Sequence, residues 1–208
     1  DRSTWAGAAP NGVLHSDASP AQGGAMTQQA PHFDAAADFY EILTNAEARL
    51  RKEGELIQEC LETAPAREVA DIACGTGLHA HFVAELGAWV KAFDLSKGMV
   101  AHAERLRPHP RIAYAPGDMR ALSGGPYGLV VCLGNSLCLL RNEEELGRCF
   151  GGVAQQLHAG GLFLLQIRNG QAAQARKPKQ RIERRTADES EVIAVKNPLP
   201  KKAPLMMR

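Results

Sequence analysis

Apolar residues follow two different patterns along the chain, and the change between them divides it. From Phe33 to Leu61 they recur at helical spacing, which predicts one or two helices with Gly54 as a weak point. Pro65 ends this helical region. Five short apolar or β-branched runs follow and are predicted to be strands: Val69–Ala73, Val90–Phe93, Ile112–Ala115, Leu129–Leu133 and Leu162–Ile167.

Segments that can form helices lie between these runs, at residues 78–87, 97–107 and 143–158. Asn142, followed three residues later by Glu145, predicts a helix cap with a reciprocal partner, and Ala159–Gly161 is expected to stop that helix. Strands joined by helices run parallel, and continuous apolar runs suit strands covered on both faces. The sequence therefore predicts an α/β fold with a doubly wound, mostly parallel sheet.

The same pattern divides the chain into four parts. Residues 1–32 are rich in Ala, Gly, Pro, Ser and Gln and are predicted to be a disordered tail. Residues 33–65 are predicted to form a helical cap and residues 66–170 the α/β core. In residues 171–208 the runs at 181–186 and 192–196 predict a hairpin that acts as a lid over the site.

Composition limits the classes of partner. The 208 residues suit one domain plus tails, and 24 Lys and Arg against 23 Asp and Glu create no field that would attract nucleic acid or a membrane. The basic run Arg176–Arg185 contains Glu183 and no aromatic residue, so we interpret it as a solvated flank of the hairpin. The predicted partner is a small molecule, and the oligomeric state stays open.

Cysteine and histidine usage argues for a reduced protein without a metal. The five cysteines are an odd number with no C-x-x-C pair, and the N-terminus lacks a signal-peptide pattern, which predicts a cytoplasmic location. His79 and His81 are two residues apart on a predicted helix and face different ways, so we expect no metal site. Cys74 has no evident base partner and is interpreted as structural.

The segment from Asp71 to Gly77 links the first predicted strand to a helix. Its two glycines let the backbone turn tightly and approach a ligand. Gly75–Ala80 also fits the G-x-G-x-x-[GA] pattern of dinucleotide-binding folds, so the loop alone is ambiguous. Asp71 shifts the balance, because a carboxylate would repel a pyrophosphate but could serve the ammonium group of S-adenosylmethionine.

Two further acids follow the next strands. Asp94 ends the second strand, 17 residues after Gly77, where a carboxylate can accept hydrogen bonds from two ribose hydroxyls of either cofactor. Asp118 follows the third strand and could accept from an adenine amino group, with Met119 offering an apolar surface. A dehydrogenase does not need this third acid.

These segments together resemble the class I S-adenosylmethionine-dependent methyltransferases. The resemblance rests on DIACGTG, AFDLSKGMV, PGDM and VVCLGNSLCLL and covers about residues 36–170. Together with GLFLLQIRN, these segments are similar to the glycine and sarcosine N-methyltransferase group and its small-molecule relatives. The resemblance implies a Rossmann-like fold and S-adenosylmethionine as cofactor. The residues it places at the cofactor are Asp71, Ala73, Gly75, Asp94, Leu95, Met99, Asp118, Met119 and Leu133, with Tyr40 and Arg49 closing over it.

The resemblance also implies an acceptor site. Asn135 and Arg168 match the residues that hold the amino-acid substrate in the glycine-methylating enzymes. This sequence departs from their pattern at Ile167, where we associate a His with those enzymes, and at Leu137-Cys138 in place of a more polar run. The methyl acceptor is therefore left open between an amine, an amino acid and other small molecules.

Methyl transfer from a sulfonium needs an in-line approach of a lone pair, so binding residues can suffice and no general base is assigned. Two alternatives stay open: an NAD(P)-dependent oxidoreductase, and a non-catalytic remnant that binds a nucleotide. A complete fold of the resembled class has two antiparallel strands after the fifth. The sequence therefore predicts that these C-terminal strands are missing and that the chain is part of a longer protein.

Overall fold

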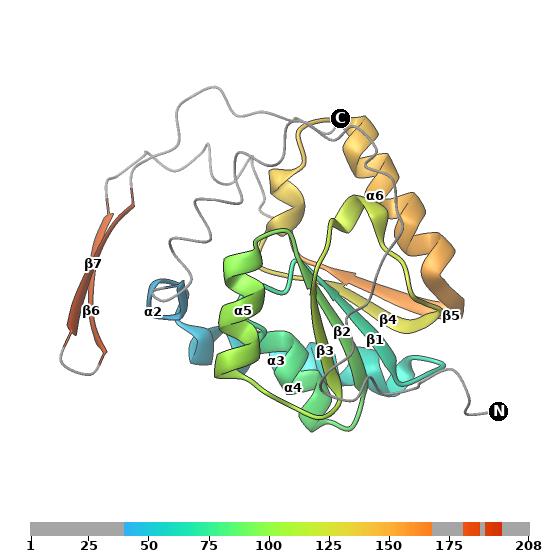
Figure 1. Cartoon of the computed structure of the whole chain (residues 1–208), viewed down its shortest axis with the longest axis horizontal. Helices are drawn as coiled ribbons and strands as arrows, with labels where there is room; N and C mark the ends of the chain where they lie inside the picture. The colour runs from blue at the N-terminus through green and yellow to red at the C-terminus, as the bar shows by residue number, and fades with distance from the viewer. Residues whose placement is uncertain (1–39, 168–180, 188–189, 197–208) are drawn as a thin grey trace.

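A computed structural model describes residues 40–167, 181–187 and 190–196 of the chain (Figure 1). Its centre is a parallel five-stranded sheet with the order β3-β2-β1-β4-β5. The strands are β1 (Glu68–Ile72), β2 (Trp89–Asp94), β3 (Ile112–Pro116), β4 (Tyr127–Cys132) and β5 (Leu157–Leu165). The predicted doubly wound α/β fold is confirmed.

Helices cover both faces of this sheet. They are α2 (Tyr40–Thr44), α3 (Ala46–Thr63), α4 (Leu78–Glu85), α5 (Lys97–Leu106) and α6 (Glu143–Gln156), with short 3-10 helices η2 (Met119–Ala121) and η3 (Ser136–Leu139). In the described part of the chain no helix is both long and apolar enough to cross a membrane.

Two apolar clusters sandwich the sheet because successive strand residues point to opposite faces. On one face, Ile57 of α3 and Val83 of α4 pack with Val69 and Val131. On the other face, residues of α6 and η2, including Val153 and Met119, pack with strand residues such as Ala70 and Val130. The central strands are buried on both sides, which explains their near-continuous apolar runs.

The chain reverses its direction of winding beside β1. This strand pairs with β2 on one side and β4 on the other, so the segments that follow β1, β2 and β4 leave from the same edge of the sheet. Ligands of open α/β sheets bind at such a point, outside the carboxyl ends of the strands. The topology therefore locates a candidate site before any side chain is considered.

The N-terminal helical region breaks at Asn45, and the predicted weak point at Gly54 is wrong. Asn45 adopts a left-handed conformation (φ 54°), and its side chain accepts a hydrogen bond from the Ala48 N–H, which starts α3. Gly54 lies buried inside α3, where a Cβ atom would stand 3.3 Å from the ring of Phe82. The glycine therefore serves close packing between α3 and α4.

Helix α6 differs from the prediction at both ends, in the hydrogen bonds of its N-terminal cap and in the residue at which it ends. The Asn142 side chain does accept from the Glu145 N–H at 2.8 Å, but the Glu145 carboxylate accepts from the N–H of Arg141 rather than from that of Asn142. The helix ends at Gln156, ahead of the glycines that were expected to stop it. Gly160 (φ 77°) instead lies in an irregular stretch of β5, where the pairing with β4 changes register.

Strands β6 (Arg181–Ala187) and β7 (Ser190–Lys196) form a separate antiparallel pair beside α2 (Figure 1). This agrees with the predicted hairpin, whereas its role as a lid stays a prediction. Residues 1–32, predicted to be a disordered tail, lie outside the described residues.

Two glycine substitutions test the packing of this core. A Cβ on Gly128, at the start of β4, would stand 2.0 Å from the carbonyl oxygen of Ala66, a backbone atom that cannot move aside. We expect Gly128→Ala to lower the free energy of unfolding by about 1–3 kcal/mol or more. Gly151→Ala, at an exposed position of α6 with open space around it, should raise it by up to about 1 kcal/mol.

Urea denaturation of both variants beside the parent chain would measure these changes. Equal effects of the two substitutions would contradict the close approach of β4 to the segment before β1.

Candidate functional site

A cavity of about 210 Å³ opens at the carboxyl ends of the central strands, with α2 at its side. Nine of the residues predicted to bind a ligand line it: Tyr40, Ala73, Gly75, Asp94, Leu95, Met99, Asp118, Met119 and Asn135. Five residues that the sequence analysis did not single out line it as well: Ser96, Gly117, Gly134, Ser136 and Leu139. Segments as far apart in the sequence as Tyr40 and Leu139 therefore meet in one pocket.

The loop after β1 forms the floor of this pocket through an unusual backbone path. Ala73 (φ 71°), Gly75 (φ 55°) and Gly77 (φ 77°) all have positive φ. The N–H groups of Ala73 and Cys74 donate to the carbonyl of Phe93 at 2.7 and 2.9 Å, which holds the loop against β2. A Cβ on Gly77 would stand 2.6 Å from the hydroxyl oxygen of Tyr114, so conformation and packing both require glycine there.

Asp94 joins this loop to the start of α5. Its Oδ2 accepts from the Gly75 N–H at 2.8 Å and its Oδ1 accepts from the Ser96 N–H at 2.9 Å. Ser96 in turn caps α5 by accepting from the Met99 N–H. These bonds fix the carboxylate at the pocket wall. Ser96 could have been found from the sequence, because it stands two residues after the strand-end acid Asp94, at the position that caps the next helix.

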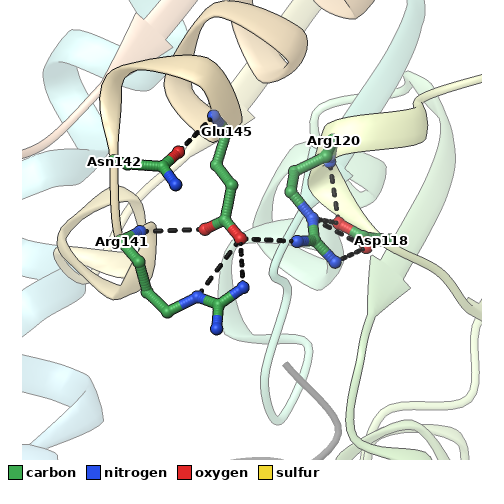
Figure 2. Close-up of polar contacts among 5 residues, drawn as sticks. All are labelled: Asp118, Arg120, Arg141, Asn142 and Glu145. Carbon is green, nitrogen blue, oxygen red and sulfur yellow. Dashed lines mark hydrogen bonds and ion pairs between the residues drawn. The ribbon is translucent and has the colours of Figure 1, made fainter. Parts of the chain in front are cut away.

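Asp118, which also lines the pocket, is held by Arg120 (Figure 2). The Arg120 Nε donates to both carboxylate oxygens at 3.0 and 2.9 Å, Nη2 donates to Oδ2, and the Arg120 N–H donates to Oδ1 at 2.9 Å. Burial alone would raise the pKa of Asp118, but the hydrogen bonds and charge of Arg120 lower it below the usual value. The side chain therefore stays an anion that can only accept hydrogen bonds.

Asp71 lies beneath the pocket floor rather than among its lining residues. The residue is 1% exposed, and the Ala80 N–H near the start of α4 stabilises its charged form. Its Oδ2 is without a hydrogen-bond partner among the described residues. Burial raises the pKa of Asp71 to about 6, the charge of Asp94 adds to this, and His79 opposes it. The position differs from the predicted direct contact with an ammonium group.

Glu53 of α3 links several parts of the site. It pairs with His79 Nε2 at 2.8 Å and accepts from the Gln166 amide at 3.1 Å, while the Gln166 side-chain oxygen accepts from the Gly134 N–H at 3.0 Å. The hydrogen bond with His79 lowers the pKa of Glu53. The N–H of Gly134, on the pocket wall, is thus positioned through a chain of side chains that begins on α3.

Two other predicted residues lie just behind the pocket lining. The Arg49 guanidinium lies 3.9 Å from Glu53 and would stand 3.2 Å from a Cβ on Gly134. Leu133 is buried at the end of β4. Arg168 falls outside the described residues, so its predicted contact with an acceptor stays a prediction.

Helix α2 is held over the loop by a charged contact. The Glu41 carboxylate accepts from the Thr76 hydroxyl at 2.8 Å and pairs with Arg107, which also donates to the Thr76 carbonyl. Burial would raise the pKa of Glu41, but these partners lower it below the usual value. The contact keeps the neighbouring Tyr40 at the side of the pocket.

Comparison with known proteins agrees with this geometry. Residues 69–161 match the family model described as a methyltransferase domain. The chain is 34% identical to a dTDP-3-amino-3,4,6-trideoxy-alpha-D-glucopyranose N,N-dimethyltransferase of Streptomyces venezuelae, over 50% of this chain and 44% of the relative. It is 30% identical to a glycine/sarcosine N-methyltransferase of Halorhodospira halochloris, over 66% of this chain and 53% of the relative.

The fold agrees as well. The crystal structure of DesVI from Streptomyces venezuelae superposes with a TM-score of 0.64 at 25% identity, over 80% of this chain and 71% of that one. Residues 69–161 therefore form a methyltransferase domain. The chain spans about half the length of the curated relatives it matches, and within it the methyltransferase domain contains the whole pocket floor.

The buried Asp71 gives the methyltransferase domain a measurable pH dependence. A carboxyl group whose pKa rises from 3.8 unfolded to about 6 folded stabilises the native state below pH 4, and that contribution is lost as the pH rises through 6. The shift corresponds to about 3 kcal/mol for this buried side chain. Asp71→Asn removes the titration, so the variant should lack this loss.

Chemical denaturation of the parent chain and of Asp71→Asn from pH 4 to 7.5, without ligand, would measure the difference. The parent chain should lose stability relative to the variant between pH 4 and 7. Parallel pH profiles would contradict a raised pKa at Asp71.

Proposed function

We propose that this domain binds S-adenosylmethionine in the pocket and transfers its methyl group to a small-molecule amine. The observation that carries the proposal is the pair of anchored carboxylates, Asp94 and Asp118, which follow neighbouring strands and line one pocket. One suits the two hydroxyls of a ribose and the other the exocyclic amino group of an adenine. The family match supports this assignment.

The remaining lining residues fit the rest of the cofactor. Gly75 leaves room beside the loop for the methionyl part, and the apolar side chains of Leu95, Met99 and Met119 can pack against a flat base. When bound, S-adenosylmethionine supplies a methyl group on an electrophilic sulfonium. The work of the protein is then to exclude water and align the acceptor, which can contribute several kcal/mol to lowering the barrier.

The surroundings of α4 argue against the alternative of a nicotinamide dinucleotide. In dinucleotide-binding folds a pyrophosphate occupies the N-terminus of this helix. Here the Ala80 N–H near that end stabilises the charge of the buried Asp71 carboxylate, and Glu41 adds a second carboxylate at Thr76. Arg107 compensates the charge of Glu41. The buried Asp71 carboxylate would repel a pyrophosphate, whereas it would favour the cationic methionyl end of S-adenosylmethionine.

The names of the relatives support the proposed class of methyl acceptor. Their names include amino-sugar N,N-dimethyltransferases, glycine/sarcosine N-methyltransferases and a cypemycin N-terminal methyltransferase, and all of these imply nitrogen acceptors. Asn135 and Ser136 line the pocket after β4 and are polar groups that could orient an amine. We propose Asn135, with Arg168 beyond the described core, as acceptor contacts.

Calorimetric titration with S-adenosylmethionine, S-adenosylhomocysteine and NADH tests the cofactor. Asp94→Ala should weaken binding of the first two by about 1.5–3 kcal/mol, the range for hydrogen bonds to a charged group. Glu62→Ala, at an exposed position of α3, is the matched control and should bind as the parent chain does. Preferential binding of NADH, or unchanged affinity in Asp94→Ala, would refute the assignment.

Turnover is tested separately, by methyl transfer from labelled S-adenosylmethionine to glycine, sarcosine, an amino sugar nucleotide and a free peptide N-terminus. We expect the labelled methyl group to appear on the nitrogen of at least one of these acceptors. Cofactor binding without transfer to any amine would support the non-catalytic alternative.

A further inference from the structure

Arg120 occupies most of the hydrogen-bond acceptor positions of the Asp118 carboxylate and leaves about one of them for a ligand. Three N–H groups of Arg120, from Nε, Nη2 and the backbone, make four contacts with the two carboxylate oxygens, because the Nε–H is shared between both oxygens. A carboxylate offers about four acceptor positions, so about one remains for a ligand. Since the side chain of Asp118 is about a quarter exposed and lines the pocket, that position is open to the cavity.

Arg120 is itself fixed at its other end. Its Nη1 donates to Glu145 of α6 at 2.9 Å, and the side chains of Arg120 and Glu145 are only 10% and 7% exposed (Figure 2). Water therefore competes little with these bonds. The guanidinium is bonded to a carboxylate on each side and cannot rotate without breaking one of the two contacts.

Glu145 is anchored in turn by the beginning of α6. Its carboxylate accepts from the N–H of Arg141 at 2.9 Å and pairs with the Arg141 guanidinium, while its own N–H donates to Asn142. Hydrogen bonds from the side chain and backbone of Arg141 lower the pKa of Glu145 to about 2. The chain of contacts thus ends on a helix that packs against the sheet.

We propose that Arg120, held by Glu145, is a positioning residue that selects the base of the cofactor by leaving Asp118 one acceptor position aimed into the pocket. This rests on the proposed function. A single N–H of an exocyclic amino group matches that position, and a base that carries a hydrogen or a carbonyl there does not. Arg120 acts through Asp118 and needs no contact with the ligand.

The substitutions separate orientation from charge. Arg120→Lys keeps the positive charge but replaces the planar fork by a point charge that cannot hold both oxygens. Glu145→Gln weakens the far anchor of Arg120 without touching Asp118. Arg148→Met is the control, because the charge of Arg148 also contributes to the lowered pKa of Asp118, but from an exposed position on α6.

The experiment measures the affinities of each variant for S-adenosylhomocysteine and for its analogue in which a hydrogen replaces the exocyclic amino group of the purine. The parent chain should prefer the amino ligand by about ten-fold to a hundred-fold, the range for a hydrogen bond to a charged group. Arg120→Lys and Glu145→Gln should reduce this ratio several-fold, whereas Arg148→Met should preserve it. The ratio within one variant cancels any general loss of affinity, and melting curves check that each variant is folded.

The outcomes are distinct. If the parent chain binds neither ligand, the proposed function fails. If the parent chain binds both ligands equally, or if Arg120→Lys and Glu145→Gln keep the full preference, Arg120 does not position the base contact. A loss of preference in Arg148→Met as large as in Arg120→Lys would assign the effect to charge alone and would also overturn the proposal.

Discussion

The carboxylate of Asp94 is the contact on which the site depends most. It accepts one hydrogen bond from the loop after β1 and one from the turn that starts α5, so a single side chain joins the ends of two segments of the sheet edge. The loop it holds contains three residues with positive φ and could not keep this path by backbone preference alone. The pocket floor is therefore shaped before a ligand arrives.

Around this contact, three helices are each fastened to the site by one glutamate. Glu41 fastens α2 to Thr76, Glu53 joins α3 to His79 and Gln166, and Glu145 connects α6 to Arg120. Each carboxylate has a cationic or protonatable partner and at least one further hydrogen bond, which is what a partly buried charge requires. The apolar clusters hold the helices to the sheet, and the glutamates set their alignment with the loops.

The sequence predicted the parts of this structure that depend on local patterns. The five strands, the loop before α4 and the strand-end acids Asp94 and Asp118 could be found because each is signalled within a few residues. The break at Asn45, the role of Gly54 and the link between Arg120 and Glu145 depend on contacts between distant segments, for which no local signal exists. The sequence predicted Asp71 beside the methionyl part of the cofactor, whereas its side chain is buried in the sheet and is not among the pocket-lining residues, a position that depends on the packing around β1.

The loop after β1 lies between two carboxylates whose pKa values are shifted in opposite directions. Beneath it, Asp71 has a pKa raised to about 6 by burial, so weak acid neutralises a charge that is costly to bury. Above it, Glu41 has a pKa below its usual value, and its hold on Thr76 survives until the medium is strongly acidic. At pH values between these two pKa values, Asp71 is neutral while Glu41 is still charged and bonded to Thr76. The surroundings of the loop therefore favour the folded state most on the weakly acidic side of neutrality.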